Sequence, residues 1–80
     1  MQNITSLSAL SPGESAVVSE LDSRLQSGMR RRLQDVGLIK GTTVKYIQKS
    51  PLGDPTAYLI RGTVFALRND DAACVQIEIF

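Results

Sequence analysis

The segment Ser50-Pro51-Leu52-Gly53-Asp54-Pro55 constrains this chain most strongly, because it cannot continue a regular strand. Each proline fixes φ at about −65° and lacks the backbone N–H donor, while Gly53 and Asp54 tolerate turn geometry. The runs on either side are typical of strands, so the segment is predicted to be a stiff loop between them. Its central residue is a leucine, where a water-facing loop usually carries a polar side chain. This combination suggests a binding element.

Length and charge limit the broad class of protein. Eighty residues can build one core, and we expect a single domain over residues 1–80 with its core at about 7–79. Nine basic and eight acidic residues give a formal charge of +1, which offers no overall attraction to nucleic acid or anionic lipid. No apolar run is long enough to cross a bilayer, and the first residues lack the features of a signal peptide. We therefore expect a cytoplasmic protein without membrane insertion and without a nucleic-acid partner.

The chain has one cysteine and no histidine, which argues against several kinds of site. An intrachain disulfide needs two cysteines, and the common zinc sites need several thiolates or imidazoles. A serine–histidine or cysteine–histidine pair cannot form, because the chain has no histidine to act as the general base. We expect Cys74 to be a half-buried strand residue rather than a redox or ligand thiol, and we expect no enzyme activity.

Hydrophobic periodicity predicts one helix among short strands. The start of the chain, residues 4–10, is compatible with one helical turn that Ser11-Pro12-Gly13 ends. Strands are predicted over residues 16–21, 43–49, 57–61, 63–68 and 74–79. A flat sheet of this size would leave exposed edges, so five strands with one helix inserted after the first favour a mainly β fold. The predicted architecture is a small antiparallel barrel.

The predicted helix has Asp22, Ser23 or Ser27 as its N-cap residue and ends before Gly37. Four apolar residues fall within a narrow arc at about 100° per residue and should face the core. They are Leu25, Met29, Leu33 and Val36.

Three glycines mark predicted turns. Gly37 occupies the place of a left-handed helix C-cap, and Gly41 lies in a tight turn into the next strand. Gly62 is expected to form a kink or bulge between two strands.

Three consecutive arginines, Arg30, Arg31 and Arg32, suggest a nucleic-acid patch, but a helix turns successive residues apart by about 100°. We expect Arg31 to point to water and Arg32 to lay its aliphatic stem over the edge of the core. Three interpretations of the arginines stay open: a solvated helix face, a docking surface for an acidic protein, and a nucleic-acid contact. A small RNA-binding barrel, which would use Gly41–Tyr46 and the arginines, is the weakest functional alternative.

Asp54, Asp70 and Asp71 are the candidate ligands for a hard cation. They lack the spaced carboxylates and distal glutamate of an EF-hand loop. We therefore expect Asp54 to shape its own loop through a hydrogen bond. Residues 69–73 should form a solvated polar turn, or one helical turn capped by Asn69. A metal-sensing domain that uses these carboxylates is the second functional hypothesis.

Two interpretations of the loop stay open. In one, it is a connector whose leucine folds back to cap the barrel. In the other, it is a docking element that contacts a partner through Pro51, Leu52, Gly53, Asp54 and Pro55, aided by Arg31. The second interpretation favours a binding module, because a stiff loop loses little entropy on association.

Several motifs together resemble the FeoA family, the small cytosolic component of bacterial ferrous iron uptake. Leu33-Gln34-Asp35-Val36-Gly37-Leu38-Ile39-Lys40-Gly41-Thr42 is similar to that family's helix-to-turn element. Pro51-Leu52-Gly53-Asp54-Pro55 is similar to its loop between strands. Gly62, Ala66-Leu67-Arg68, Ala72 and residues 75–79 resemble its closing pattern. The resemblance extends from about Leu7 to Ile79 in consistent order.

The resemblance implies an SH3-like barrel, related to the C-terminal domain of DtxR-type iron-dependent repressors, with no catalysis of its own. It implies the cytosolic domain of a FeoB membrane permease as the partner, and a cytoplasmic location that is peripheral to the inner membrane through that partner. The family is often labelled metal-binding, but Fe(II) usually prefers imidazole or thiolate ligands, and this chain has only Cys74. We therefore expect no metal site or cofactor, with Fe(II) or another divalent metal as the alternative.

Overall fold

The computed structural model describes residues 3–79, which form six strands, two α-helices and one 3-10 turn. In chain order these are β1 (Asn3–Ser6), η1 (Leu7–Ala9), β2 (Ser15–Leu21), α1 (Ser27–Asp35), β3 (Thr43–Lys49), β4 (Thr56–Ile60), β5 (Thr63–Leu67), α2 (Asn69–Ala72) and β6 (Val75–Ile79). The expected boundaries of the strands agree with these bounds to within a residue at each end. No helix in this described part of the chain has the length and apolar character to cross a membrane.

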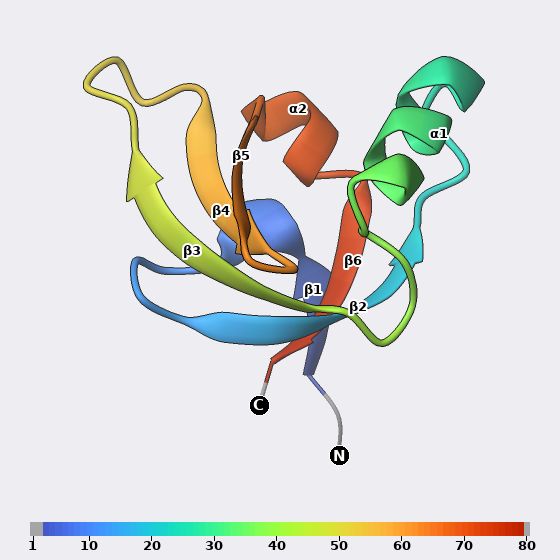
Figure 1. The fold of residues 1–80 in the computed structure, drawn as a ribbon, viewed down its shortest axis with the longest axis horizontal. Helices are drawn as coiled ribbons and strands as arrows, with labels where there is room; N and C mark the ends of the chain where they lie inside the picture. The colour runs from blue at the N-terminus through green and yellow to red at the C-terminus, as the bar shows by residue number, and fades with distance from the viewer. Residues whose placement is uncertain (1–2, 80) are drawn as a thin grey trace.

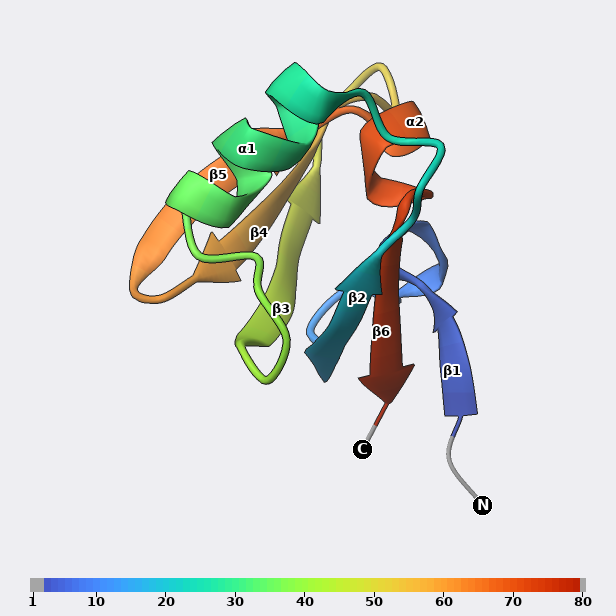
Figure 2. The same cartoon turned by 90° about the vertical axis from the view of Figure 1, so that its right-hand side faces the viewer.

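The strands form one antiparallel sheet in the order β1-β6-β2-β3-β4-β5. The register shifts between Val18 and Glu20 in β2 and between Tyr46 and Gln48 in β3, which marks two bulges. Bulges increase the local twist of a sheet. Figures 1 and 2 show the resulting strong bend, with α1 and α2 together at one end of the curved sheet. The mainly β, antiparallel architecture predicted from the sequence is therefore confirmed.

The strand β1 was not expected, and it raises the number of strands from the predicted five to six. Residues 4–10 were predicted as one helical turn, but only Leu7–Ala9 form such a turn, while Asn3–Ser6 pair with β6. The four-residue segment carries no clear alternation of its own, so its partner at the other end of the chain decides its conformation. As a consequence, α1 follows the second strand and not the first.

Alternate strand residues and both helices contribute to one hydrophobic core. Its buried members are Leu7, Leu10, Ala16, Val18, Leu25, Leu33, Leu38, Val44, Tyr46, Tyr58, Ile60, Leu67, Ala72, Val75 and Ile77. Tyr46 and Tyr58 pack edge to face, with ring centroids 5.7 Å apart, and burial raises the pKa of Tyr58. Cys74 is half-buried against this cluster.

The end of α1 is a Schellman motif around Gly37. The Leu38 N–H donates to the Leu33 carbonyl at 2.9 Å, and the Gly37 N–H donates to the Gln34 carbonyl at 3.0 Å. Gly37 has a φ of 108°, which a residue with a Cβ rarely adopts. The beginning of the helix differs from the prediction, because Gln26 is the N-cap residue and no side chain caps it.

The β4–β5 connection is a two-residue hairpin formed by Arg61 and Gly62, both with positive φ. Such angles are typical of the tight turns that match strand twist. The structure thus places Gly62 in a hairpin turn and not in the expected kink or bulge. The side chain of Arg61 lies against Gly37, where an added Cβ would overlap its Cδ. Gly41, with a φ of 92°, lies in the turn before β3.

We predict that Gly37→Ala lowers the free energy of unfolding by about 1–2 kcal/mol, because alanine is strained in the left-handed region and meets the Arg61 side chain. Urea denaturation checks this value. Gly28→Ala is the matched control, because Gly28 lies within α1 and a Cβ there would meet nothing within 4 Å. It should be neutral or stabilise the protein by up to about 1 kcal/mol. Equal effects of the two substitutions would contradict the assignment.

Candidate functional site

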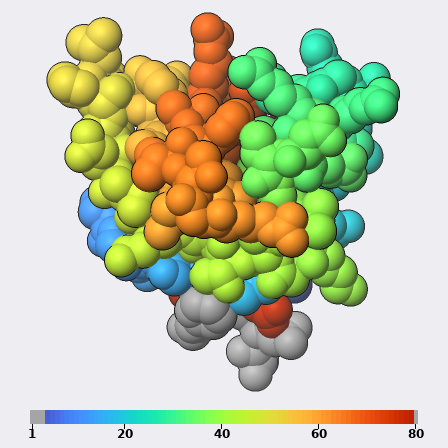
Figure 3. Space-filling model, in the orientation of Figure 1, coloured from blue at the N-terminus to red at the C-terminus, as the bar shows by residue number. Residues whose placement is uncertain are grey.

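The β3–β4 loop projects from the fold as a tight, internally bonded turn. The Gly53 N–H donates to the Ser50 carbonyl at 2.8 Å, and the Ser50 N–H donates to the Pro55 carbonyl at 3.0 Å. The Asp54–Pro55 peptide bond is cis. Leu52 is 94% exposed, more than any other large apolar side chain that the structure describes. Figure 3 shows the loop, in yellow, standing out at one corner of the molecule. Leu52 therefore points to solvent and does not cap the barrel.

Asn69 ties this loop to the beginning of α2. Its backbone N–H donates to Asp54 Oδ1 at 2.9 Å, and its Nδ2 donates to the Gly53 carbonyl at 3.1 Å. The buried Thr56 donates from Oγ1 to Asn69 Oδ1 at 3.4 Å. The first N–H groups of a helix have no partner within the helix, so the Asp54 carboxylate acts as a cap for α2. The loop is thus held by a contact that crosses the fold.

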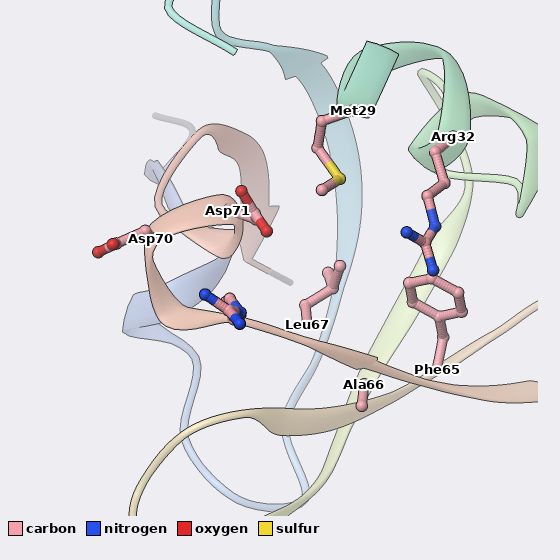
Figure 4. Close-up of a pocket in the computed structure, with 8 residues that line it drawn as sticks. Met29, Arg32, Phe65, Ala66, Leu67, Asp70 and Asp71 are labelled. Carbon is pink, nitrogen blue, oxygen red and sulfur yellow. The ribbon is translucent and has the colours of Figure 1, made fainter. Parts of the chain in front are cut away.

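The three carboxylates considered as metal ligands have different surroundings. Asp54 bonds to the backbone of Asn69, across the fold and not within its own turn. Figure 4 shows Asp71 pointing into a groove beside α2 and Asp70 pointing away from it. Within residues 3–79, no three Asp, Glu, Cys or His side chains are grouped closely enough to hold a metal ion.

The arginines of α1 point in different directions. Arg30 is half-buried and donates to the carbonyls of Asp22, at 2.5 Å, and Leu21, at 3.4 Å, so it joins α1 to the end of β2. Arg31 is exposed, and Arg32 lines the groove. Arg30 therefore has a structural role that was not expected from the sequence, whereas Arg32 is exposed. Because the three side chains diverge, they form no continuous stripe along which a phosphate backbone could lie.

The part of the chain that the structure describes contains one ion pair, between Arg24 and Asp22, with Nη2 and Oδ2 2.9 Å apart. The hydrogen bond from Arg24 lowers the pKa of Asp22 below its ordinary value. Arg32 and Arg68 have no such partner among residues 3–79. Two guanidinium groups near the groove are therefore available to a carboxylate from outside the chain.

A groove of about 430 Å³ lies between α1, β5 and α2. Its lining consists of Met29, Arg32, Phe65, Ala66, Leu67, Arg68, Asp70 and Asp71. In Figure 4 the side chains of Met29 and Leu67 approach each other from opposite walls, and Arg32 extends toward the ring of Phe65. The groove combines an apolar middle with charged ends. Sequence reasoning missed it, because its walls come from three segments far apart along the chain.

The structure does not bring the predicted contact residues into one place. Pro51, Leu52 and Pro55 are exposed and share the projecting loop. Arg31 lies on α1, which Figure 1 shows at the opposite end of the molecule's long axis, with β5 and α2 between it and the loop. Asn69 was expected only as a local helix cap, but Arg68 is the N-cap residue of α2 and Asn69 is its first residue. Its residue type indicated capping, but no sequence signal connected it to the loop.

The chain was compared with known protein families and curated sequences. The model of the FeoA domain family matches residues 5–79. The chain is 34% identical over 73 residues to a Fe(2+) transport protein A/Fe(2+) transporter FeoB fusion protein of Porphyromonas gingivalis. The match covers 91% of this chain and 8% of that protein, so the chain spans less than a tenth of this curated relative.

Solved structures give the same assignment. The FeoA protein of Chlorobium tepidum has a TM-score of 0.88 and 32% identity, over 95% of this chain and 70% of that one. FeoA of Stenotrophomonas maltophilia, described as a zinc complex and a procaryotic SH3 domain protein, has a TM-score of 0.80 and 35% identity, over 91% and 88% of the two chains. IdeR of T. acidophilum shares only the fold, at 19% identity and a TM-score of 0.83, over 96% of this chain and 34% of that one. The expected SH3-like fold is confirmed, and IdeR shares it.

We predict that Asn69→Ala loosens the β3–β4 loop, because it removes the side-chain bonds to Gly53 and Thr56. The free energy of unfolding should fall by about 1–3 kcal/mol, and the Gly53 amide should exchange faster with solvent. Urea denaturation and solvent-exchange NMR measure the two effects. Asp70→Ala, at an exposed site on the same helix, should change the free energy by less than about 0.5 kcal/mol. Unchanged exchange at Gly53 in Asn69→Ala would show that the loop is held by other contacts.

Proposed function

The chain belongs to the FeoA domain family, and from this membership we propose that it is a noncatalytic accessory domain of bacterial ferrous iron uptake. It acts in the cytoplasm, docks on the cytosolic part of a FeoB-type permease and adjusts the activity or assembly of that permease. The β3–β4 loop, with Leu52 at its tip, is the proposed contact. The exposure of Leu52 on a loop anchored to α2 is the observation that carries this assignment.

The fusion protein of Porphyromonas gingivalis supports the choice of partner. In that relative, a segment similar to this chain belongs to the same polypeptide as a FeoB transporter. Covalent linkage keeps two domains at a high effective concentration, which favours even a weak contact between them. The proposed contact surface would hold this domain on its permease, and this contact would place the domain at the membrane.

The geometry of the loop suits a docking role. A large apolar side chain in water gains free energy when a partner covers it, by about 1.5–3 kcal/mol for a leucine. The hydrogen bonds within the loop and to Asn69 already restrict its conformation. Less entropy is therefore lost on association than for a flexible segment. Pro51 and Pro55 contribute to this rigidity, because their φ angles are fixed.

Arg31 is the second proposed contact, through its charge. It is exposed on α1 and lies far from the loop. A partner that touches both must span the face formed by the loop, α2 and α1. Exposed charges at the rim of an interface mainly raise the rate of association. Leu52 would then provide affinity, while Arg31 would favour an acidic surface on the permease.

We predict that Leu52→Asp weakens binding to the cytosolic domain of the permease by about 10- to 150-fold and leaves the fold intact. The loss arises because the apolar contact is replaced by a charge that must be desolvated in the interface. Calorimetric titration of the purified domains measures the affinity, and thermal unfolding checks the fold.

Ile39→Asp is the matched control, because Ile39 is also an exposed apolar residue, at 43% exposure, but lies outside the loop. It should bind within about twofold of the wild-type protein. Undiminished binding by Leu52→Asp, or an equal loss in both variants, would rule out the loop as the specific contact.

A further inference from the structure

The groove between α1, β5 and α2 extends the recognition surface beyond the loop. We propose that it is a socket for a short extended segment of a partner protein. The segment places an acidic side chain at Arg32, an apolar side chain in the middle of the groove and a basic side chain at Asp71.

The middle of the groove is suited to an apolar side chain. Met29 and Phe65 are only half-buried, and they stand beside the buried Leu67. Figure 4 shows the Met29 side chain reaching toward Leu67 across the open space. Methionine is flexible and adapts to irregular apolar partners. An apolar side chain placed here removes further surface of Met29 and Phe65 from water, which favours binding.

Charged side chains stand at both ends of the groove. Arg32 lies beside Phe65 at one end, and Asp71 points inward at the other, where Arg68 and the outward-pointing Asp70 also lie. Neither Arg32 nor Asp71 is part of an ion pair among residues 3–79. A segment with a carboxylate and an ammonium group at its two ends complements both charges at once. Charge complementarity of this kind fixes the direction of the bound segment more than it adds affinity.

The size of the groove is compatible with a few residues. Its volume of about 430 Å³ lies within the range of about 300–1,000 Å³ that is typical of ligand pockets. In an extended segment, alternate side chains share one face. The pattern acidic-x-apolar-x-basic therefore presents its three specific side chains to the groove together and leaves the other two toward solvent.

The socket deepens the proposed function, because it adds a second contact along the same edge of the molecule as the loop, with α2 between the two. Its test does not require the permease. Failure of the peptide experiment below would leave docking through Leu52 intact, and failure of the Leu52→Asp prediction would leave the socket intact.

The test uses the intact protein and the probe peptide acetyl-Glu-Ser-Leu-Ser-Lys-amide, titrated by NMR. We expect millimolar binding, with shifts of the Met29 methyl group and of the backbone amides of residues 65–71. Acetyl-Gln-Ser-Leu-Ser-Gln-amide lacks the charges, and acetyl-Glu-Ser-Ala-Ser-Lys-amide lacks the apolar anchor. Each should bind at least about fivefold more weakly, because each loses one class of contact.

Arg32→Glu and Lys40→Glu form a pair of variants, since each reverses one positive charge at an exposed position and Lys40 does not line the groove. Arg32→Glu should weaken binding of the charged peptide by about five- to tenfold, whereas Lys40→Glu should change it by less than about twofold. The neutral peptide should not distinguish the two variants. Absence of shifts at the groove, shifts confined to other surfaces, or equal effects of the two variants would overturn the proposal.

Discussion

The pairing of β6 with both β1 and β2 is the interaction on which the rest of the structure depends. Through it, the last described strand lies between two strands from the beginning of the chain. Val75 and Ile77 are completely buried in this position. Because α2 directly precedes β6, the same pairing fixes where this short helix lies. A helix of four residues has little stability of its own, so its position must come from this tertiary contact.

The helix α2 then supports both proposed contacts. On one side, Asn69 holds the β3–β4 loop through its backbone N–H and its side-chain amide. On the other side, Asp71 closes one end of the groove. The loop in turn stabilises the helix, because the Asp54 carboxylate accepts a hydrogen bond from an N–H that would otherwise have no partner. The loop, α2 and α1 thus follow one another along one edge of the molecule, as Figure 1 shows.

The proposed recognition depends on shape and local charge. The net charge of +1 gives no strong overall field, so a partner must be selected by particular contacts. A leucine that is 94% exposed offers an apolar contact, and the groove between α1, β5 and α2 offers a hollow. A domain of this size contacts a partner through only a few residues. Rigid presentation of those residues is the most effective way in which it can gain affinity.

The sequence by itself determined the features that depend on near neighbours. The pattern of residues 43–49 predicts β3 with its observed bounds, the prolines predict the loop, and Gly37 predicts the end of α1. The ordered motifs also indicated the family. Only the tertiary structure decided that Asn3–Ser6 form a strand, that Leu52 points outward and that Asn69 holds the loop. These outcomes join residues far apart along the chain, such as Asn3 with Ile79, and a local pattern carries no information about such a partner.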